Sequence, residues 1–358
     1  MKRIIILGAG NVGKAIAYDL HNDYELTIGD NHEKRLDKLN EYGTTKIIDA
    51  SNEDEVRREI KRYDLVVSAL PGNLGYDIVK NSIELGKDIV DVSFMPEDPL
   101  KLDEKAKKKG VTAIVDAGFG PGMSNVFMGE IANNLDSIKR AIIRIGGLPK
   151  NPEPPLFYKI TWSPHDLIEE YVRPARIIRE GKIVEIDPFE KIKEITIKNF
   201  EFEEFYSDGL RTLLYTIPNV EYMEETTLRW PGHLNKMKVL RELGFFDEKN
   251  IEDTLEVITP KMEFESDDFS IMDIEVEGIL KKEKKTIKYF FYDEADEGFS
   301  SMSRSTGFTT ATFARLILEN QLEKGVLPPE LLGMDKGFYQ YITQKLKQKG
   351  ITIERRES

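Results

Sequence analysis

The first pattern with chemical consequences is a glycine-rich turn near the N-terminus. Residues 8–13 read Gly-Ala-Gly-Asn-Val-Gly and follow an apolar run that predicts a buried strand. In this spacing Gly8 permits a tight turn, Gly10 lets the backbone approach a pyrophosphate, and Gly13 allows a helix to pack closely on the strand. The start of that helix offers free N–H groups to phosphates. We therefore expect a dinucleotide to bind at Gly8, Gly10, Asn11, Val12 and Gly13.

A carboxylate follows where such a site needs one for the cofactor's ribose. The second expected strand ends at Asp30, close to the roughly 20-residue spacing of dinucleotide-binding domains. Asp30 would accept hydrogen bonds from both ribose hydroxyls and repel a 2′-phosphate, which favours NAD over NADP, and Asn31 could assist. Ligands of parallel sheets bind at the carboxyl ends of the strands. The next two strand ends therefore add Asp49 and Ala50 near the adenine, and Ala69, Leu70 and Pro71 near the nicotinamide.

The surrounding pattern supplies the elements that position these residues. Up to about residue 122, short apolar strands alternate with polar helical stretches, which is typical of parallel βαβ units. We expect strands at 3–7, 25–29, 46–49, 65–68, 88–91 and 112–115. Because these strands are apolar without alternation, both faces of the sheet should be covered. Residues 1–122 are thus predicted to form a Rossmann NAD-binding domain, an α/β fold with a parallel sheet.

The pattern changes after this domain. From about 183 to 297, apolar and polar residues alternate, which indicates antiparallel strands with one buried face. We expect residues 123–305 to form a second, α+β domain on a largely antiparallel sheet, for substrate binding and dimerisation. Residues 306–358 are predicted to form C-terminal helices that pack back on the Rossmann domain. Because the β-rich middle could pair across subunits, a homodimer is expected.

The composition excludes several classes of function. The 358 residues carry a net charge of −13, which disfavours nucleic acid or an anionic membrane as the main partner. There is no cysteine, and the four histidines are scattered, so neither a thiolate nor a metal site is expected. No apolar run approaches the roughly 18 residues of a membrane helix. We expect a cytoplasmic protein that binds a small molecule.

Seven further motifs follow one another along nearly the whole chain. They occupy residues 116–123 (DAGFGPGM), 146–153 (GGLP with PE), 161–175 (TWSP with EEY and PA), 207–213 (SDGLRTL), 227–233 (TLRWPGH), 306–308 (TGF) and 325–330 (GVLPPE). In this order they resemble the motifs of the saccharopine dehydrogenase superfamily. The resemblance is greatest to its short lysine 6-dehydrogenases, and it implies an NAD-dependent amino-acid dehydrogenase.

Two departures from the longer saccharopine reductases narrow what the resemblance implies. Those enzymes typically have a Ser-Arg pair after the second strand to hold the NADP phosphate, whereas this chain has Asp30 and Asn31. The chain is also shorter, which leaves less material around a bulky substrate. The resemblance therefore implies oxidative deamination of the ε-amino group of L-lysine to the 6-semialdehyde, with NADH and ammonia as products. The semialdehyde then cyclises to piperideine-6-carboxylate.

Such a reaction needs a group that handles protons. An amine gives up hydride only as the neutral base, and the iminium product needs an activated water. Asp91 and Asp116 both end strands on the cofactor side, and either could hold the amine or relay its proton. The alternative for each is a carboxylate that caps the next turn. His233, in the Arg-Trp-Pro-Gly-His motif, is the third catalytic candidate, and its alternative is a hydrogen-bonded structural histidine.

Lysine also carries an α-carboxylate, which arginine binds through two parallel, charge-assisted hydrogen bonds. Arg211 and Arg229 are candidates because each lies inside a matched motif of the second domain. Arg173 is a third. For each of them, a structural ion pair is the alternative.

Two other functions stay open. One is a reductive member of the same superfamily, a saccharopine or carboxynorspermidine reductase, which joins an amine to an aldehyde. The other is a non-catalytic NAD(H) sensor whose second domain binds a partner.

Overall fold

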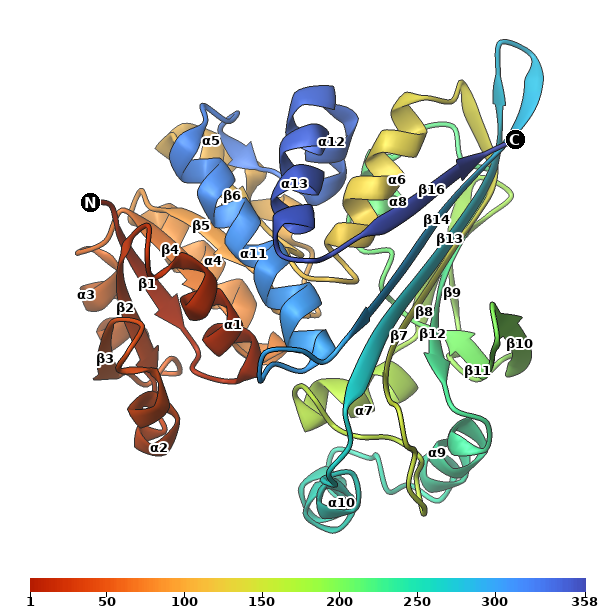
Figure 1. The fold of residues 1–358 in the computed structure, drawn as a ribbon, viewed down its shortest axis with the longest axis horizontal. Coiled ribbons are helices and arrows are strands. Elements are labelled where there is room, and N and C mark those ends of the chain that lie inside the picture. Colours follow the sequence, from red (N-terminus) through yellow and green to blue (C-terminus); the bar gives the residue numbers. More distant parts are fainter. The chain divides into compact units, whose positions relative to one another are not determined.

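The chain forms two compact units in the computed structural model, which describes residues 1–358. The first unit comprises residues 1–129 and 303–351, and the second comprises residues 130–302 and 352–358. Figure 1 follows the chain by colour through both units. The division therefore differs from the predicted boundaries after residues 122 and 305. It also assigns residues 352–358 to the second unit, because they join its sheet as an edge strand.

The first unit is built on a seven-stranded parallel sheet in the order β15-β6-β5-β4-β1-β2-β3. Its strands are β1 (Arg3–Leu7), β2 (Glu25–Asp30), β3 (Thr44–Ile47), β4 (Leu65–Ser68), β5 (Asp88–Asp91), β6 (Thr112–Ile114) and β15 (Gly325–Val326). Their side chains are mostly apolar, and those of Ile5, Val66 and Ile89 are completely buried. Such strands require helices on both faces of the sheet. The predicted third strand, 46–49, lies two residues too late, because Asp49 already begins a turn in which its carboxylate accepts from the Ser51 N–H.

Most helices of the first unit connect these strands, and the last two follow β15. They are α1 (Asn11–Leu20), α2 (Glu33–Leu36), α3 (Glu53–Ile60), α4 (Gly72–Glu84), α5 (Asp103–Lys109), α12 (Pro329–Met334) and α13 (Lys336–Gln348). Two longer helices, α6 (Met123–Asn133) and α11 (Ser301–Glu319), run across the unit boundaries. Arg315 of α11 pairs with Asp23, and both Arg315 and Lys349 pair with buried Asp19 of α1. Ion pairs thus tie the C-terminal helices to the first helix of the Rossmann fold.

The second unit is built on a mixed, mostly antiparallel sheet in the order β10-β11-β12-β7-β13-β14-β16. Two further strands extend it, since β8 pairs with β12 and β9 pairs with β8. The strands are β7 (Ser137–Pro149), β8 (Ala175–Arg179), β9 (Lys182–Ile186), β10 (Lys193–Ile197), β11 (Phe200–Tyr206), β12 (Tyr222–Arg229), β13 (Asp268–Leu280), β14 (Glu283–Glu294) and β16 (Ile353–Glu357). The pair β7–β12 is parallel. The predicted fold class, a Rossmann domain with a second domain on a largely antiparallel sheet, is confirmed.

An aromatic core lies on one face of this second sheet. Tyr171, Phe202, Phe205 and Phe269 are buried there together with aliphatic side chains of β7, β12 and β13. Four helices complete the unit: α7 (Pro164–Val172), α8 (Leu213–Thr216), α9 (His233–Glu242) and α10 (Ile251–Ile258). None of the helices in either unit has the length and apolar character needed to cross a bilayer.

Candidate functional site

The glycine turn lies between β1 and α1, and its three glycines differ in what surrounds them. A Cβ on Gly8, whose φ is +105°, would lie 2.3 Å from the carbonyl oxygen of Ala69, and one on Gly13 would lie 1.9 Å from that of Gly8. A Cβ on Gly10 would meet no atom within 4 Å. The backbone packing of the fold therefore requires Gly8 and Gly13. Gly10 instead faces open space at the start of α1, which fits a bound pyrophosphate.

Asp30 is buried at the end of β2, with its carboxylate turned toward the glycine turn. Its Oδ2 accepts from the Ala9 N–H at 2.7 Å, and its Oδ1 accepts from the His32 N–H at 2.8 Å. These bonds fix the carboxylate where a ribose hydroxyl could donate to its remaining lone pairs. Asn31 beside it is exposed. The Arg35 guanidinium lies 3.7 Å from Oδ2, and this cation would attract the 2′-phosphate that Asp30 repels.

The other predicted cofactor residues lie at the same edge of the sheet, because parallel strands end on one side. Asp49 and Ala50 follow β3. The Asp49 side chain accepts from Ser51 Oγ at 2.7 Å, and these Ser51 hydrogen bonds lower the pKa of the carboxyl group. Residues 69–71 follow β4, and the Ala69 N–H donates to the Leu7 carbonyl at 2.8 Å. The turn after β4 is therefore tied to the end of β1, beside the glycine turn.

The two candidate carboxylates lie at the ends of neighbouring strands: Asp91 ends β5, and Asp116 follows β6. Asp91 is the last residue of β5 and is completely buried, and its Oδ1 accepts from Ser93 Oγ at 2.6 Å. Burial raises the pKa of Asp91 to about 6; hydrogen bonds from Ser93 and Ser68 oppose this rise, and the charge of Asp116 adds to it. The Ala117 N–H donates to the Asp91 carbonyl at 3.0 Å. The fold therefore brings the two carboxyl groups close enough for the charge of Asp116 to affect the pKa of Asp91.

Backbone strain distinguishes two of the predicted residues. Among non-glycine residues with left-handed backbones, only Asp116 (φ +51°) and Arg211 (φ +50°) are buried. The others lie in exposed or partly exposed turns. A left-handed conformation costs about 1 kcal/mol or more outside glycine and persists where the surroundings impose it, often at functional sites. One buried, strained, charged residue thus lies in each unit.

The loop that carries Arg211 is held on two sides. Asp208 accepts from the backbone N–H of Arg176 at 3.1 Å and from its Nε and Nη2 at 2.8 Å each, a bidentate ion pair. On the other side a Cβ on Gly209 would lie 1.6 Å from Oε1 of Glu225, so the loop backbone lies directly against that carboxylate. These contacts join the loop to β8 and β12. They account for how a buried arginine is kept in a strained conformation.

Arg229 and His233 lie together in a buried network of the second unit. Arg229 donates through Nε to the Tyr171 hydroxyl at 3.1 Å and pairs through Nη2 with Glu170. Because Tyr171 accepts from Arg229, its own proton goes to Nε2 of His233 at 2.8 Å, and His233 Nδ1–H donates to the Leu156 carbonyl at 2.7 Å. Burial and the Arg229 charge lower the pKa of His233 to about 3. These contacts favour the structural alternative for both residues.

Arg173, the third predicted arginine, lies at the end of α7 with its side chain 14% exposed. Its Nη2 lies 3.5 Å from Oε2 of Glu169, one helical turn earlier. This contact between residues four apart is the helical ion pair that sequence spacing allows. It likewise fits the structural alternative.

Sequence reasoning missed the groups that surround the predicted ones. They are Arg35 beside Asp30, the hydroxyls of Ser68 and Ser93 at Asp91, and Glu170 with Tyr171 around Arg229. Two of these groups carried a signal, because Ser68 ends an expected strand and the Glu-Glu-Tyr segment lies within a motif. Arg35 carried none, since its approach to Asp30 depends on how the chain turns after β2.

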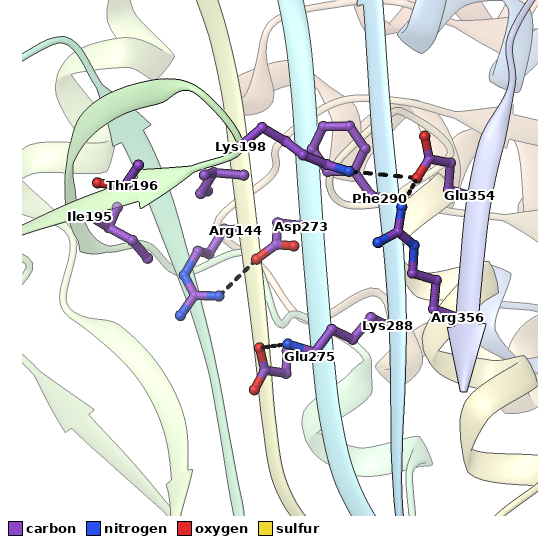
Figure 2. A pocket seen from close by; sticks show the side chains of 11 residues that line it. Arg144, Ile195, Thr196, Lys198, Asp273, Glu275, Lys288, Phe290, Glu354 and Arg356 are labelled. Atoms are coloured by element: carbon purple, nitrogen blue, oxygen red, sulfur yellow. Dashed lines mark hydrogen bonds and ion pairs between the residues drawn. The ribbon is translucent and has the colours of Figure 1, made fainter. Parts of the chain in front are cut away.

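A charged groove with a volume of about 310 Å³ lies on the second sheet. Figure 2 shows the side chains that line it. Side chains of β7, β13, β14 and β16 line it, together with residues of β10. Its charges pair with one another: Arg144 with Asp273 (2.9 Å), Lys288 with Glu275 (2.7 Å), Lys198 with Glu354 (3.6 Å) and Arg356 with Glu354 (3.0 Å). None of the predicted site residues lines this groove. Because its charges are already paired within the chain, it offers no evident anchor for a charged ligand.

The comparison with protein families covers both units. Residues 4–114 match the family model described as saccharopine dehydrogenase NADP binding domain, and residues 118–351 match that of the saccharopine dehydrogenase C-terminal domain. The chain belongs to the saccharopine dehydrogenase family. The resemblance inferred from the sequence motifs is thereby confirmed for the family.

Several relatives of the family are similar over different parts of their length. The chain is 21% identical to rat alpha-aminoadipic semialdehyde synthase, over 98% of this chain and 47% of that protein. It is 24% identical to the NADP⁺-dependent, L-glutamate-forming saccharopine dehydrogenase of Pyricularia oryzae, over 69% of this chain and 59% of that one. It therefore spans about half the length of these relatives. Carboxyaminopropylagmatine dehydrogenase of Synechocystis is 20% identical over 94% of both chains.

Among solved structures, the apo L-glutamate-forming saccharopine dehydrogenase of Saccharomyces cerevisiae matches the whole of this chain. The TM-score is 0.83, the sequence identity is 19%, and both chains are covered completely. At this identity the match establishes the shared fold.

Proposed function

We propose that this member of the saccharopine dehydrogenase family is an NAD-dependent dehydrogenase that oxidises the ε-amino group of L-lysine. The observation that carries the dinucleotide part is the open space at Gly10, between two glycines that packing requires. The fixed carboxylate of Asp30 supports it. The substrate part rests on the resemblance to lysine 6-dehydrogenases and on the buried charges of Asp116 and Arg211.

A nicotinamide dinucleotide held at Gly10 and Asp30 would supply the acceptor for the hydride that leaves the carbon bearing the ε-amino group. Lysine enters as an ammonium ion and has to lose a proton before the hydride can leave. Asp91 and Asp116 are the proposed acceptors of that proton. A carboxyl group with a pKa near 6 is partly ionised close to neutral pH, which is where a general base works well.

The same pair serves the second half of the reaction. The substrate iminium formed by hydride loss takes up water, and a carboxylate that accepts the water's proton activates it. Ammonia then leaves and the semialdehyde remains, which accounts for all atoms of lysine and water. Burial of Asp91 keeps its interactions with substrate charge strong, since solvent screens them little.

Arg211 is proposed to bind the α-carboxylate of the substrate. A guanidinium held by a rigid loop loses little side-chain freedom on binding, and a bidentate pair with a carboxylate fixes orientation as well as charge. Arg229, with Tyr171 and Glu170 around it, is instead assigned to support of the second unit. His233 is assigned to the same support.

A second candidate is the reverse chemistry, the reductive coupling of an amine to an aldehyde with NADPH. Two observations favour it. Arg35 lies 3.7 Å from the Asp30 carboxylate, where it could pair with a 2′-phosphate. The Synechocystis carboxyaminopropylagmatine dehydrogenase also matches over 94% of its own length. In this direction the same carboxylates would protonate the amine-derived groups instead of deprotonating them.

A screen of dinucleotide reduction tests the proposal. The purified chain is assayed with NAD⁺ and NADP⁺ against L-lysine, saccharopine and polyamines, and in reverse with amine, semialdehyde and reduced cofactor. We expect turnover with L-lysine and NAD⁺, and a KM for lysine at least tenfold higher in Arg211→Ala, with dinucleotide affinity unchanged. Turnover only in the reductive direction would support the second candidate. Dinucleotide binding without turnover would favour the NAD(H) sensor.

A further inference from the structure

Glu330 is a fully buried carboxylate of α12 that the proposed chemistry does not use. Its Oε2 accepts from the side-chain amide of Asn125 at 3.0 Å. The amide oxygen of Asn125 in turn accepts from the Gly122 N–H at 3.1 Å and from Ser124 Oγ at 3.2 Å. A chain of hydrogen bonds therefore leads from Glu330 to the loop between β6 and α6.

The backbones of α6 and α12 touch on both sides of this chain. A Cβ on Gly129 would lie 2.0 Å from the carbonyl oxygen of Glu330, and one on Gly333 would lie 2.0 Å from that of Val126. Contacts this close leave Glu330 no room to shift relative to Asn125. The preceding strand β15 pairs with β6, with Val326 opposite Ala113. The segment that carries Glu330 is thus fixed to the strand that leads to Asp116.

Residues 118–123 of the loop between β6 and α6 are hydrogen-bonded to one another. The Gly118 N–H donates to the Pro121 carbonyl at 3.1 Å, and the Met123 N–H donates to that of Gly118 at 2.9 Å. A Cβ on Gly122 would lie 2.0 Å from the carbonyl oxygen of Gly118. At the other end of the loop, the Ala117 N–H donates to the Asp91 carbonyl at 3.0 Å. Because the loop is bonded at both ends, we expect a displacement at Gly122 to pass toward the two carboxylates.

We infer that Glu330 is a positioning residue that, through Asn125, fixes the loop on which Asp116 lies beside Asp91. The inference rests on the proposed function only in treating Asp116 as part of the reaction site. The hydrogen bonds from Glu330 through Asn125 to Gly122, which we call the clamp, are a property of the fold. Their effect on the loop can be measured without any enzymatic turnover.

The test compares Glu330→Ala with Glu330→Gln and with Asp335→Ala as a matched control. Glu330→Gln keeps an oxygen that can accept from Asn125, so it should behave like the natural chain. Asp335 caps the nearby helix α13, because its carboxylate accepts from the Phe338 N–H at 2.9 Å. Loss of this cap should lower the stability of the chain without changing the hydrogen bonds of the loop. Amide hydrogen exchange over residues 116–123, kcat, KM and dinucleotide affinity are measured for each.

In Glu330→Ala we expect exchange over residues 116–123 to rise at least tenfold and kcat to fall at least tenfold. The KM for the amino acid and the dinucleotide affinity should change less than threefold. Native exchange in Glu330→Ala, or an equal loss of kcat in Asp335→Ala, would overturn the inference. If the natural chain turns over none of the substrates, the proposed function is wrong. The exchange experiment would still show whether Glu330 holds residues 116–123 in place.

A double variant covers the case in which Glu330→Ala does not fold. Asn125→Leu with Glu330→Met replaces both partners by apolar groups of similar shape, which can be nearly neutral for stability. It removes the bond to Gly122 without leaving a buried charge. We expect it to fold and to show the same rise in exchange over residues 116–123. An unchanged exchange rate in this variant would overturn the inference too.

Discussion

The buried carboxylate of Asp91 makes the strongest prediction for a single side chain. Its folded pKa of about 6 is raised from 3.8, so the folded chain binds the proton more tightly than the unfolded chain does. The stability that this group contributes is therefore complete below pH 4 and is lost as the pH rises through 6. Asp91→Asn stays neutral at every pH. We expect it to be more stable than the natural chain by about 3 kcal/mol at pH 7.5, and by little at pH 4.

Urea unfolding at pH 4, 5.5 and 7.5 measures this difference. Asp49→Asn is the matched control because its sign is opposite. Hydrogen bonds from Ser51 lower the pKa of Asp49, so removing this charge should reduce stability at pH 7.5 more than at pH 4. A pH-independent difference for Asp91→Asn would show that the carboxylate is not buried as the structure has it.

Asp30 and Arg35 should act in opposite directions on the choice of cofactor. Asp30→Asn keeps one of the two oxygens that accept from the Ala9 and His32 N–H groups, and it removes the charge that repels a 2′-phosphate. We expect the ratio of kcat/KM for NAD to that for NADP to fall at least tenfold. Arg35→Ala removes the nearby cation and should raise the same ratio. If this ratio is unchanged in both variants, the ribose of the cofactor does not bind at the end of β2.

The turn between β1 and α1 offers a test in which two similar substitutions have different results. Gly10→Ala places a methyl group in open space, so the chain should fold with a melting temperature within about 2 °C of the natural one. That methyl group would lie where we place the pyrophosphate, and NADH affinity should fall at least tenfold in a fluorescence titration. Gly13→Ala forces its Cβ against the Gly8 carbonyl and should unfold or strongly destabilise the first unit. Unimpaired NADH binding by folded Gly10→Ala would place the cofactor elsewhere.

The elements that the sequence predicted best are those with local signals. Apolar runs located most strands of the first unit, and the glycine spacing located the turn between β1 and α1. Strand β15 escaped prediction because its two residues, Gly325 and Val326, form a strand only by pairing with β6. The left-handed backbones of Asp116 and Arg211 could not be read from the sequence either. They depend on contacts between residues far apart, such as Asp208 with Arg176.

The roles of the buried charges depend even more on the assembled chain. Arg211 and Arg229 looked equivalent as candidates, since each is an arginine inside a motif. The fold separates them: Arg229 is bonded to Tyr171 and Glu170, and Arg211 lies in a strained loop. His233 likewise lies in the aromatic core with both ring nitrogens bonded. Motif membership alone therefore could not distinguish the surroundings of these residues or assign their chemistry.

At the scale of the whole molecule, the predictions concern the edge strands of the sheets and the association of two chains. The expected homodimer remains a prediction, and light scattering on the intact chain tests it. If sheets pair across subunits, the strands available for pairing are those at the edges, and one edge is β16. This strand carries Glu354, Arg355, Arg356 and Glu357, all exposed. A row of charges on an edge strand opposes pairing with a second chain, so we expect any dimer to use another surface.

Removal of residues 352–358 should reveal what this edge strand protects. It would expose the edge of β14, where Ile287, Tyr289 and Phe291 alternate as buried apolar residues. Lys288 is the one charged residue in the segment of β14 that pairs with β16, and an unpaired, mostly apolar edge of this kind is a template for intermolecular strand pairing. We expect the shortened chain to form larger species in light scattering within hours at micromolar concentration, while its first unit still binds NADH. Arg356→Ala, which keeps the strand, should stay in the state of the intact chain. If the shortened chain also stays in that state, the edge of β14 needs no protection and β16 must serve another purpose.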